Sequence, residues 1–217
     1  MWLQSVCLAY IRCRLGSEPG LLEWCEVMEG PALRKARDRL RAAENAFEQM
    51  RATKIGSPDF DHGWYAFLVA QNSFFSALEQ GSKQGASKGW FDQIKNERRT
   101  DALLCYLQQA RHSDEHSLRP TVAKTQPTIQ INEPHTATID PVTGKPHLKL
   151  IIGEEINARF APSVEALLPV TNRGKTYDPP QTHMGQPLET TYPIKVADLC
   201  IQYLRRVLTE AESLVQG

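Results

Sequence analysis

The stretch "PALRKARDRLRAAENAFEQM", residues 31–50, predicts a long amphipathic helix. Pro31 suits the first turn, because proline lacks the backbone N–H that the start of a helix leaves unpaired. The apolar residues after it recur at gaps that alternate between three and four positions, which places them on one face of a helix. That face holds Leu33, Ala36, Leu40, Ala43, Phe47 and Met50.

Four further helices are expected. The first fits residues 64–80, and a short one carries Trp90 and Ile94 after a flexible turn. Thr100 is a candidate N-cap for the next, because its hydroxyl can accept a hydrogen bond from a free backbone N–H. The last helix must return to the bundle to bury its apolar face. That face holds Ala197, Cys200, Ile201, Leu204, Leu208, Ala211 and Val215.

Between residues 120 and 193 the pattern changes to β-branched alternation and turn residues. The turn signal "DPVTGK" predicts an antiparallel hairpin of residues 136–140 with 146–152, joined by 127–132. Residues 161–193 are rich in proline and predict a long, irregular loop.

The expected fold class is therefore α+β. We expect residues 1–217 to form one domain, mainly a helical bundle made of residues 31–119 and 194–215. A small antiparallel β hairpin or sheet is inserted before the C-terminal helix.

Composition narrows the class of protein. The 217 residues can bury a real core, and the 41% hydrophobic and 23% charged shares are those of a globular protein. The formal net charge is zero, so any binding of nucleic acid must come from a local patch. The sequence lacks G-x-G-x-x-G, GxxxxGK[ST] and G-x-S-x-G, so a nucleotide-binding fold or a serine hydrolase has no support.

The cysteines and the N-terminus point to a cytoplasmic protein without a membrane anchor. The segment 1–16 makes a poor signal peptide, is too short to span a membrane, and is expected to be a helix packed on the body. Five cysteines without CxxC spacing do not suit a zinc ribbon or a disulfide scaffold, so we expect reduced thiols. They are Cys7, Cys13, Cys25, Cys105 and Cys200.

A dense polar cluster ends the helix predicted after Thr100. In "QARHSDEH", two imidazoles, two carboxylates and a guanidinium fall within six residues: Arg111, His112, Asp114, Glu115 and His116. His112 and His116 share one helix face, and Arg111 and Glu115 share another. The two carboxylates can hold the cations in place, so groups for proton transfer and for anion stabilisation are all present.

This cluster resembles the R-x4-6-H motif of the HEPN superfamily, with Arg111 and His116 as the motif residues and His112 as the polar residue after the arginine. The segment is also similar to the "ARNSDEH" type found in bacterial HEPN-like proteins, except that His112 replaces the usual asparagine. HEPN domains are small helical bundles, usually dimeric. Many are metal-independent ribonucleases of bacterial toxin–antitoxin and phage-defence systems. The β insertion is not part of the basic family pattern.

The resemblance implies an RNA substrate, a homodimer, an antitoxin or other protein partner, and no cofactor or metal. A histidine of near-neutral pKa can exchange protons with the ribose 2′-OH and the leaving 5′-oxygen. The guanidinium can bind the scissile phosphate. Phosphates could also be held by a basic cluster, although the solvent side of an amphipathic helix is the stronger interpretation of its residues. The cluster holds Arg34, Lys35, Arg37, Arg39 and Arg41.

Two other interpretations of the polar cluster stay open. His112 and His116 have the spacing of the two histidines of HExxH, but Ser113 stands where that motif has its glutamate, and a third ligand would have to come from His62, His183 or a carboxylate. Alternatively, the cluster is a salt-bridged helix end in a non-catalytic interaction module. Catalysis predicts that Arg111 and His116 converge on a solvent-reached cleft, whereas a structural role predicts that neighbouring groups consume them.

Overall fold

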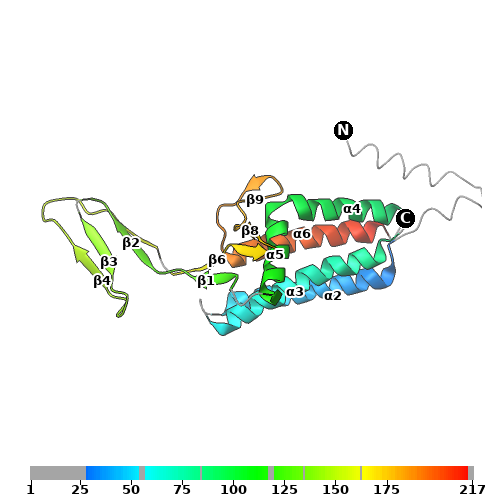
Figure 1. The fold of residues 1–217 in the computed structure, drawn as a ribbon, viewed down its shortest axis with the longest axis horizontal. Helices are drawn as coiled ribbons and strands as arrows, with labels where there is room; N and C mark the ends of the chain where they lie inside the picture. The colour runs from blue at the N-terminus through cyan, green and yellow to red at the C-terminus, as the bar shows by residue number, and fades with distance from the viewer. Residues whose placement is uncertain are drawn as a thin grey trace, which may run out of the picture.

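The computed structural model describes residues 28–53, 57–83, 85–116, 120–133, 135–161 and 163–214, except the side chains of residues 114–116 (Figure 1). The predictions made for residues 1–16 lie outside this part of the chain. Its helices are α2 (Gly30–Ala52), α3 (Pro58–Gly81), α4 (Gly85–Thr100), α5 (Ala102–His116) and α6 (Pro193–Ser213). None of these helices is long and apolar enough to cross a membrane.

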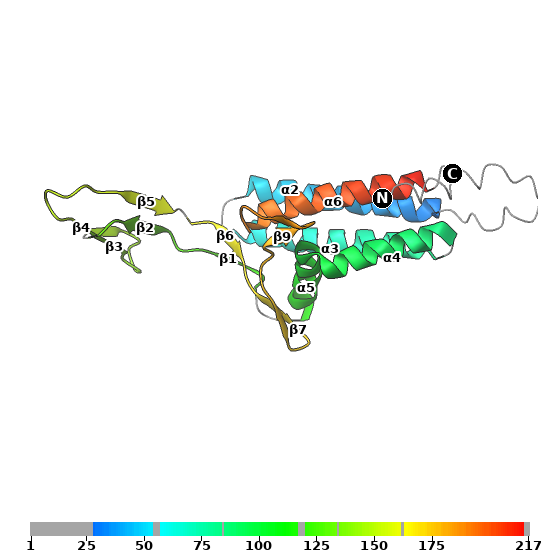
Figure 2. The ribbon, with the colours of Figure 1, turned by 90° about the horizontal axis from the view of Figure 1, so that it is seen from above.

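The helices form a bundle in which α2 and α3 run side by side and α6 lies along them (Figure 2). The face predicted for α2 is confirmed, since Leu33, Ala36 and Met50 are buried. The face predicted for α6 is buried from Ala197 to Ala211, and Val215 lies outside the described residues. At one end of this pair, the first turn of α2 lies very close to the last residue of α3. A Cβ on Gly81 would lie only 2.2 Å from the Cβ of Ala32, so this crossing requires glycine.

The boundary between α4 and α5 differs from the prediction by one residue. Thr100 belongs to α4, and its hydroxyl donates to the carbonyl of Asn96 at 2.9 Å. The N-cap of α5 is Asp101, whose Oδ1 accepts from the backbone N–H of Leu104 at 2.9 Å. The chain turns sharply there, and α5 lies across the other helices (Figures 1 and 2).

The β region consists of antiparallel pairs of short strands, which confirms the α+β class. Its strands are β1 (Val122–Lys124), β2 (Thr128–Ile131), β3 (Thr136–Ile139), β4 (Pro146–Lys149), β5 (Ala158–Ala161), β6 (Glu165–Leu167), β7 (Val170–Asn172), β8 (Lys175–Tyr177), β9 (Thr182–His183) and β10 (Gln186–Pro187). The predicted hairpin is confirmed, because β3 pairs with β4 from Thr136↔Lys149 to Ile139↔Pro146.

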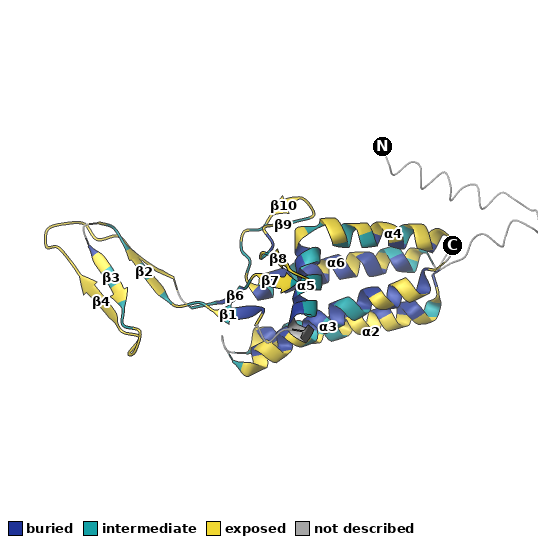
Figure 3. Cartoon of the chain, in the orientation of Figure 1, coloured by how far each residue is buried: buried dark blue, intermediate teal, exposed yellow. Residues whose placement is uncertain are grey.

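The strand expected to join that hairpin pairs elsewhere. β2 forms its ladder with β5, from Thr128↔Ala161 to Ile131↔Ala158. Asn132 closes this ladder: its N–H donates to the carbonyl of Asn157 at 3.1 Å, and its side-chain oxygen accepts from the N–H of Asn157 at 2.7 Å. Together the β2–β5 and β3–β4 pairs make an arm that extends from the bundle, and most of it is exposed (Figure 3).

The prediction of an irregular loop over residues 161–193 is wrong. β6 pairs with β1, β7 with β8, and β9 with β10. The last two pairs are closed by two-residue turns with positive φ at both positions: 50° and 77° at Arg173 and Gly174, and 49° and 78° at Met184 and Gly185. This is the backbone of type I′ turns, whose twist matches that of the flanking strands.

Candidate functional site

The predicted polar cluster forms the last turn and a half of α5, which stays helical through His116. Arg111 and His112 are half-buried, and Ser113 is buried. The side chains of Asp114, Glu115 and His116 lie outside the described part. The predicted convergence of Arg111 and His116 on a cleft therefore stays a prediction.

α5 has two faces with different neighbours. Its apolar face, which includes Leu103, Leu107 and Ala110, is buried against the bundle. A second, half-buried face carries polar residues at spacings of three and four, so they fall on one stripe of the helix. This stripe holds Asp101, Cys105, Gln109 and His112, and strands β7 and β9 pack beside it.

The β7–β8 hairpin is fixed to α5 one turn before His112. The amide Nδ2 of Asn172 donates to Oε1 of Gln109 at 2.8 Å. Just before β7, the hydroxyl of Tyr106 donates to the carbonyl of Leu168 at 2.7 Å, and burial raises the pKa of this tyrosine. The hairpin is thus anchored on a helix face that leads directly to the polar cluster.

The β9–β10 hairpin is fixed at the opposite end of the same stripe. Nδ1 of His183 lies 3.0 Å from Oδ1 of Asp101, and the N–H of Met184 donates to Oδ2 at 2.6 Å. Burial alone would raise the pKa of Asp101, but the hydrogen bonds from His183, Leu104 and Met184 outweigh it and lower the pKa. Sequence reasoning missed this pair, because no local pattern links residues 82 positions apart.

His183 is packed into the fold on its other sides as well. Its side chain is only 12% exposed, and its ring packs edge-on against Tyr203 with centroids 6.0 Å apart. Tyr203 in turn donates to Oε2 of Glu97 at 2.8 Å, and Arg206 donates to the same oxygen at 2.7 Å. These bonds join α4, α6 and the β9–β10 hairpin, so the group holds the fold together.

The basic residues predicted to bind nucleic acid lie on α2, apart from the stripe on α5. Arg37 pairs with Glu212 of α6 at 2.5 Å, and Arg41 lies 3.9 Å from Asp38. Arg34 is exposed. The structure therefore does not bring Arg34, Arg37 and Arg41 together with Arg111 and His112 on one surface.

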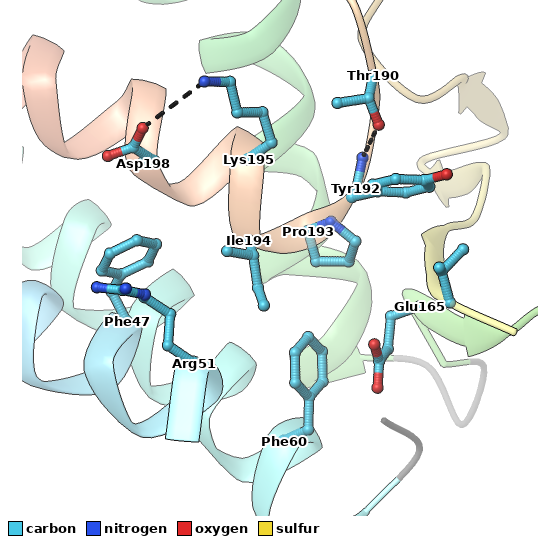
Figure 4. A pocket seen from close by; sticks show the side chains of 11 residues that line it. Phe47, Arg51, Phe60, Glu165, Thr190, Tyr192, Pro193, Ile194, Lys195 and Asp198 are labelled. Atoms are coloured by element: carbon cyan, nitrogen blue, oxygen red, sulfur yellow. Dashed lines mark hydrogen bonds and ion pairs between the residues drawn. The ribbon is translucent and has the colours of Figure 1, made fainter. Parts of the chain in front are cut away.

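A cleft of about 620 Å³ lies elsewhere, between the end of α2, the start of α3, β6 and the start of α6 (Figure 4). Its lining is mixed in charge, with Arg51 and Lys195 against Glu165 and Asp198. Lys195 and Asp198 already lie 4.0 Å apart. Of the predicted site residues whose side chains are described, none lines this cleft.

A metal site is not found among the described side chains, where no group of three or more His, Cys, Asp or Glu residues could hold an ion. Of the third ligands considered for His112 and His116, His183 is bound to Asp101 and His62 is exposed on α3. Two further histidines have other partners: His135 accepts from the N–H of Ile151 at 3.0 Å, and His147 lies 3.7 Å from Asp140.

No protein-family model, no curated protein and no solved structure matches this chain.

Proposed function

We propose that this chain is a metal-independent endoribonuclease, or an RNA-binding protein, that acts through the end of α5 as a homodimer. The observation that carries the proposal is that one continuous helix holds the whole motif, from Arg111 to His116, and that Arg111 and His112 are half-buried rather than core residues. A rigid element is what a constellation of proton-transfer and phosphate-binding groups requires.

The chemistry follows from the residue types. One imidazole takes the proton of the ribose 2′-OH while the 2′-oxygen attacks phosphorus. The bond from phosphorus to the 5′-oxygen breaks, and a second imidazole donates a proton to that oxygen. The products are a 2′,3′-cyclic phosphate and a 5′-hydroxyl, and the guanidinium of Arg111 stabilises the charge on the non-bridging oxygens.

Helix geometry is the reason for proposing a homodimer. Positions 111 and 116 are five residues apart, so a regular helix separates their directions by about 140°. Arg111 and His116 of a single chain would therefore reach one phosphate poorly. Two copies that meet at the ends of their α5 helices would supply both residue types to the same phosphate.

The test is cleavage of an end-labelled, mixed-sequence RNA in EDTA at pH 7. The variants are His116→Ala and Arg111→Ala, with His62→Ala on α3 as a matched histidine control. We expect the wild type and His62→Ala to leave 2′,3′-cyclic phosphate ends, and each site variant to lose about 10²–10⁴-fold in rate. DNA of the same sequence should stay intact. Activity only with added metal would instead assign His112 and His116 to a metal site.

A non-catalytic interaction module is the second candidate, and the arm favours it. Phe160, Leu148 and Ile152 are 63%, 52% and 101% exposed on strands or loops that cover no core. Exposed apolar surface of this kind is typical of docking sites. If this candidate is right, the folded wild-type chain should not cleave RNA, either in EDTA or with metal. Sedimentation experiments should show association of the chain, and Phe160→Asp should abolish it.

A further inference from the structure

We propose that the Arg173–Lys175 turn of the β7–β8 hairpin, rather than the basic face of α2, binds the RNA phosphate backbone beside the polar cluster of α5. The inference rests on the proposed action on RNA and names the surface that would hold the substrate.

The turn is rigid. Asn172 and Lys175 are paired across it, and only Arg173 and Gly174 connect the two strands. A positive φ of 50° is unfavourable for arginine, since its Cβ crowds the backbone in this region. Asparagine or glycine would suit the position better. A long cation is thus held at the tip of a tight turn where the turn itself does not require one.

The turn is also close to α5. Asn172, the residue before Arg173, donates to Gln109, and His112 follows Gln109 by one helical turn. Lys175 lies near Cys105 on the same stripe: burial raises the pKa of that thiol, and the positive charge of Lys175 opposes the rise. The hairpin that carries both cations therefore packs on the helix face that leads to the polar cluster.

The charges of this turn are available. Arg173 and Lys175 are exposed, and neither forms an ion pair with a described side chain. The ammonium of Lys175 lies 4.9 Å from the ring centroid of Tyr177. On α2, by contrast, two of the three predicted phosphate-binding arginines lie beside a carboxylate, Arg37 by Glu212 and Arg41 by Asp38. Unpaired surface cations can neutralise phosphates without first breaking a salt bridge.

The experiment measures binding of a labelled single-stranded 2′-O-methyl RNA, which cannot be cleaved through its 2′-oxygen, by fluorescence anisotropy at several salt concentrations. The variant is Arg173→Asn/Lys175→Gln, because asparagine tolerates the left-handed backbone and keeps the turn. Lys145→Gln/Lys149→Gln is the matched control, since it removes two exposed lysines from another hairpin. Arg34→Gln/Arg41→Gln tests α2.

We expect the turn variant to bind at least tenfold more weakly. The magnitude of the slope of log K against log salt should decrease by about 1.4. The variant removes two cations, and each phosphate contact contributes about 0.7 for single strands. The lysine control should stay within twofold of the wild type. If the wild type binds and the turn variant binds equally well, or if only the α2 variant loses affinity, the inference is wrong while the proposed function stands. A wild type that neither binds nor cleaves RNA would overturn both.

Discussion

The helical bundle and the β arm of this protein use apolar residues in opposite ways. In the bundle, Phe67 and Phe74 are fully buried, whereas Phe160 and Ile152 on the arm face solvent. Both regions contain regular hydrogen-bonded structure, yet only the bundle has a second layer to cover its apolar face. This difference indicates that the bundle provides most of the stability of the chain. The arm, a pair of two-stranded ribbons, adds little of its own.

The largest expected effect compares two phenylalanines directly. Phe74→Ala should lower the free energy of unfolding by about 3–5 kcal/mol, because it opens a cavity in a close-packed core. Phe160→Ala should change it by no more than about 0.5 kcal/mol. Urea denaturation of the two variants measures both values. A large loss from Phe160→Ala would contradict the contrast, since the arm would then be part of the cooperative unit.

Substitutions at two glycines test how closely the helices of the bundle approach one another. Gly81→Ala should cost about 1–3 kcal/mol, because the new methyl group would overlap the Cβ of Ala32 and approach the sulfur of Met28. Gly89→Ala on α4 meets no atom within 4 Å, and should stabilise the helix by about 0.5–1 kcal/mol. Thermal unfolding of the pair should give shifts of opposite sign, and shifts of the same sign would refute the close crossing at Gly81.

The free energy of unfolding should depend on pH through the carboxylate of Asp101. Its pKa is lower in the folded protein than the ordinary value of 3.8, so its contribution is complete above that value and is lost as the pH falls through the lowered one. Asp101→Ala should therefore cost about 1–2 kcal/mol at pH 7, from the lost cap and the released hairpin. The gap from the wild type should close toward pH 2.

The control for Asp101 is Asp178→Ala, which changes an exposed carboxylate. It should leave the stability nearly unchanged at both pH values. A constant gap between Asp101→Ala and the wild type across this range would show that the charge of Asp101 contributes nothing and that only its shape matters.

The smallest effect is expected at Arg37. Its ion pair with Glu212 joins α2 to α6 at the surface, where solvent screens the attraction. Arg37→Gln should cost at most about 1 kcal/mol, and less in high salt. Urea denaturation at low and high salt measures the difference. A loss as large as that of Phe74→Ala would mean that surface charges, and not core packing, hold the helices together.

The sequence predicted the elements whose signals are local. The apolar spacing of α2 and the turn "DPVTGK" between β3 and β4 depend on nearby residues, and both predictions are confirmed. The two short hairpins were missed because their turns contain Arg173-Gly174 and Met184-Gly185, where only the glycine signals a positive φ.

The site was less accessible to prediction. The tie between Asp101 and His183 depends on tertiary packing, and a helix pattern cannot distinguish an N-cap at Thr100 from one at Asp101 when both residues can cap. The motif from Arg111 to His116 was visible because it is contiguous. The strands that pack along α5, β7 near Gln109 and β9 at Asp101, were not visible in this way, because they lie more than fifty positions further along the chain.

The pairing of β1 with β6 determines how the arm could be removed from the chain. At the base of the arm, the N–H of Thr125 donates to the carbonyl of Val164 at 2.8 Å, and its hydroxyl accepts from the N–H of Val164 at 3.0 Å. The two ends of the arm are thus already joined, so a two-residue Asn-Gly turn could replace residues 126–163 and keep Thr125 opposite Val164. The loop would be shortened by roughly four halvings, and each halving lowers the entropic cost of closing it by about 0.6 kcal/mol, so the shortened chain would gain about 2.4 kcal/mol.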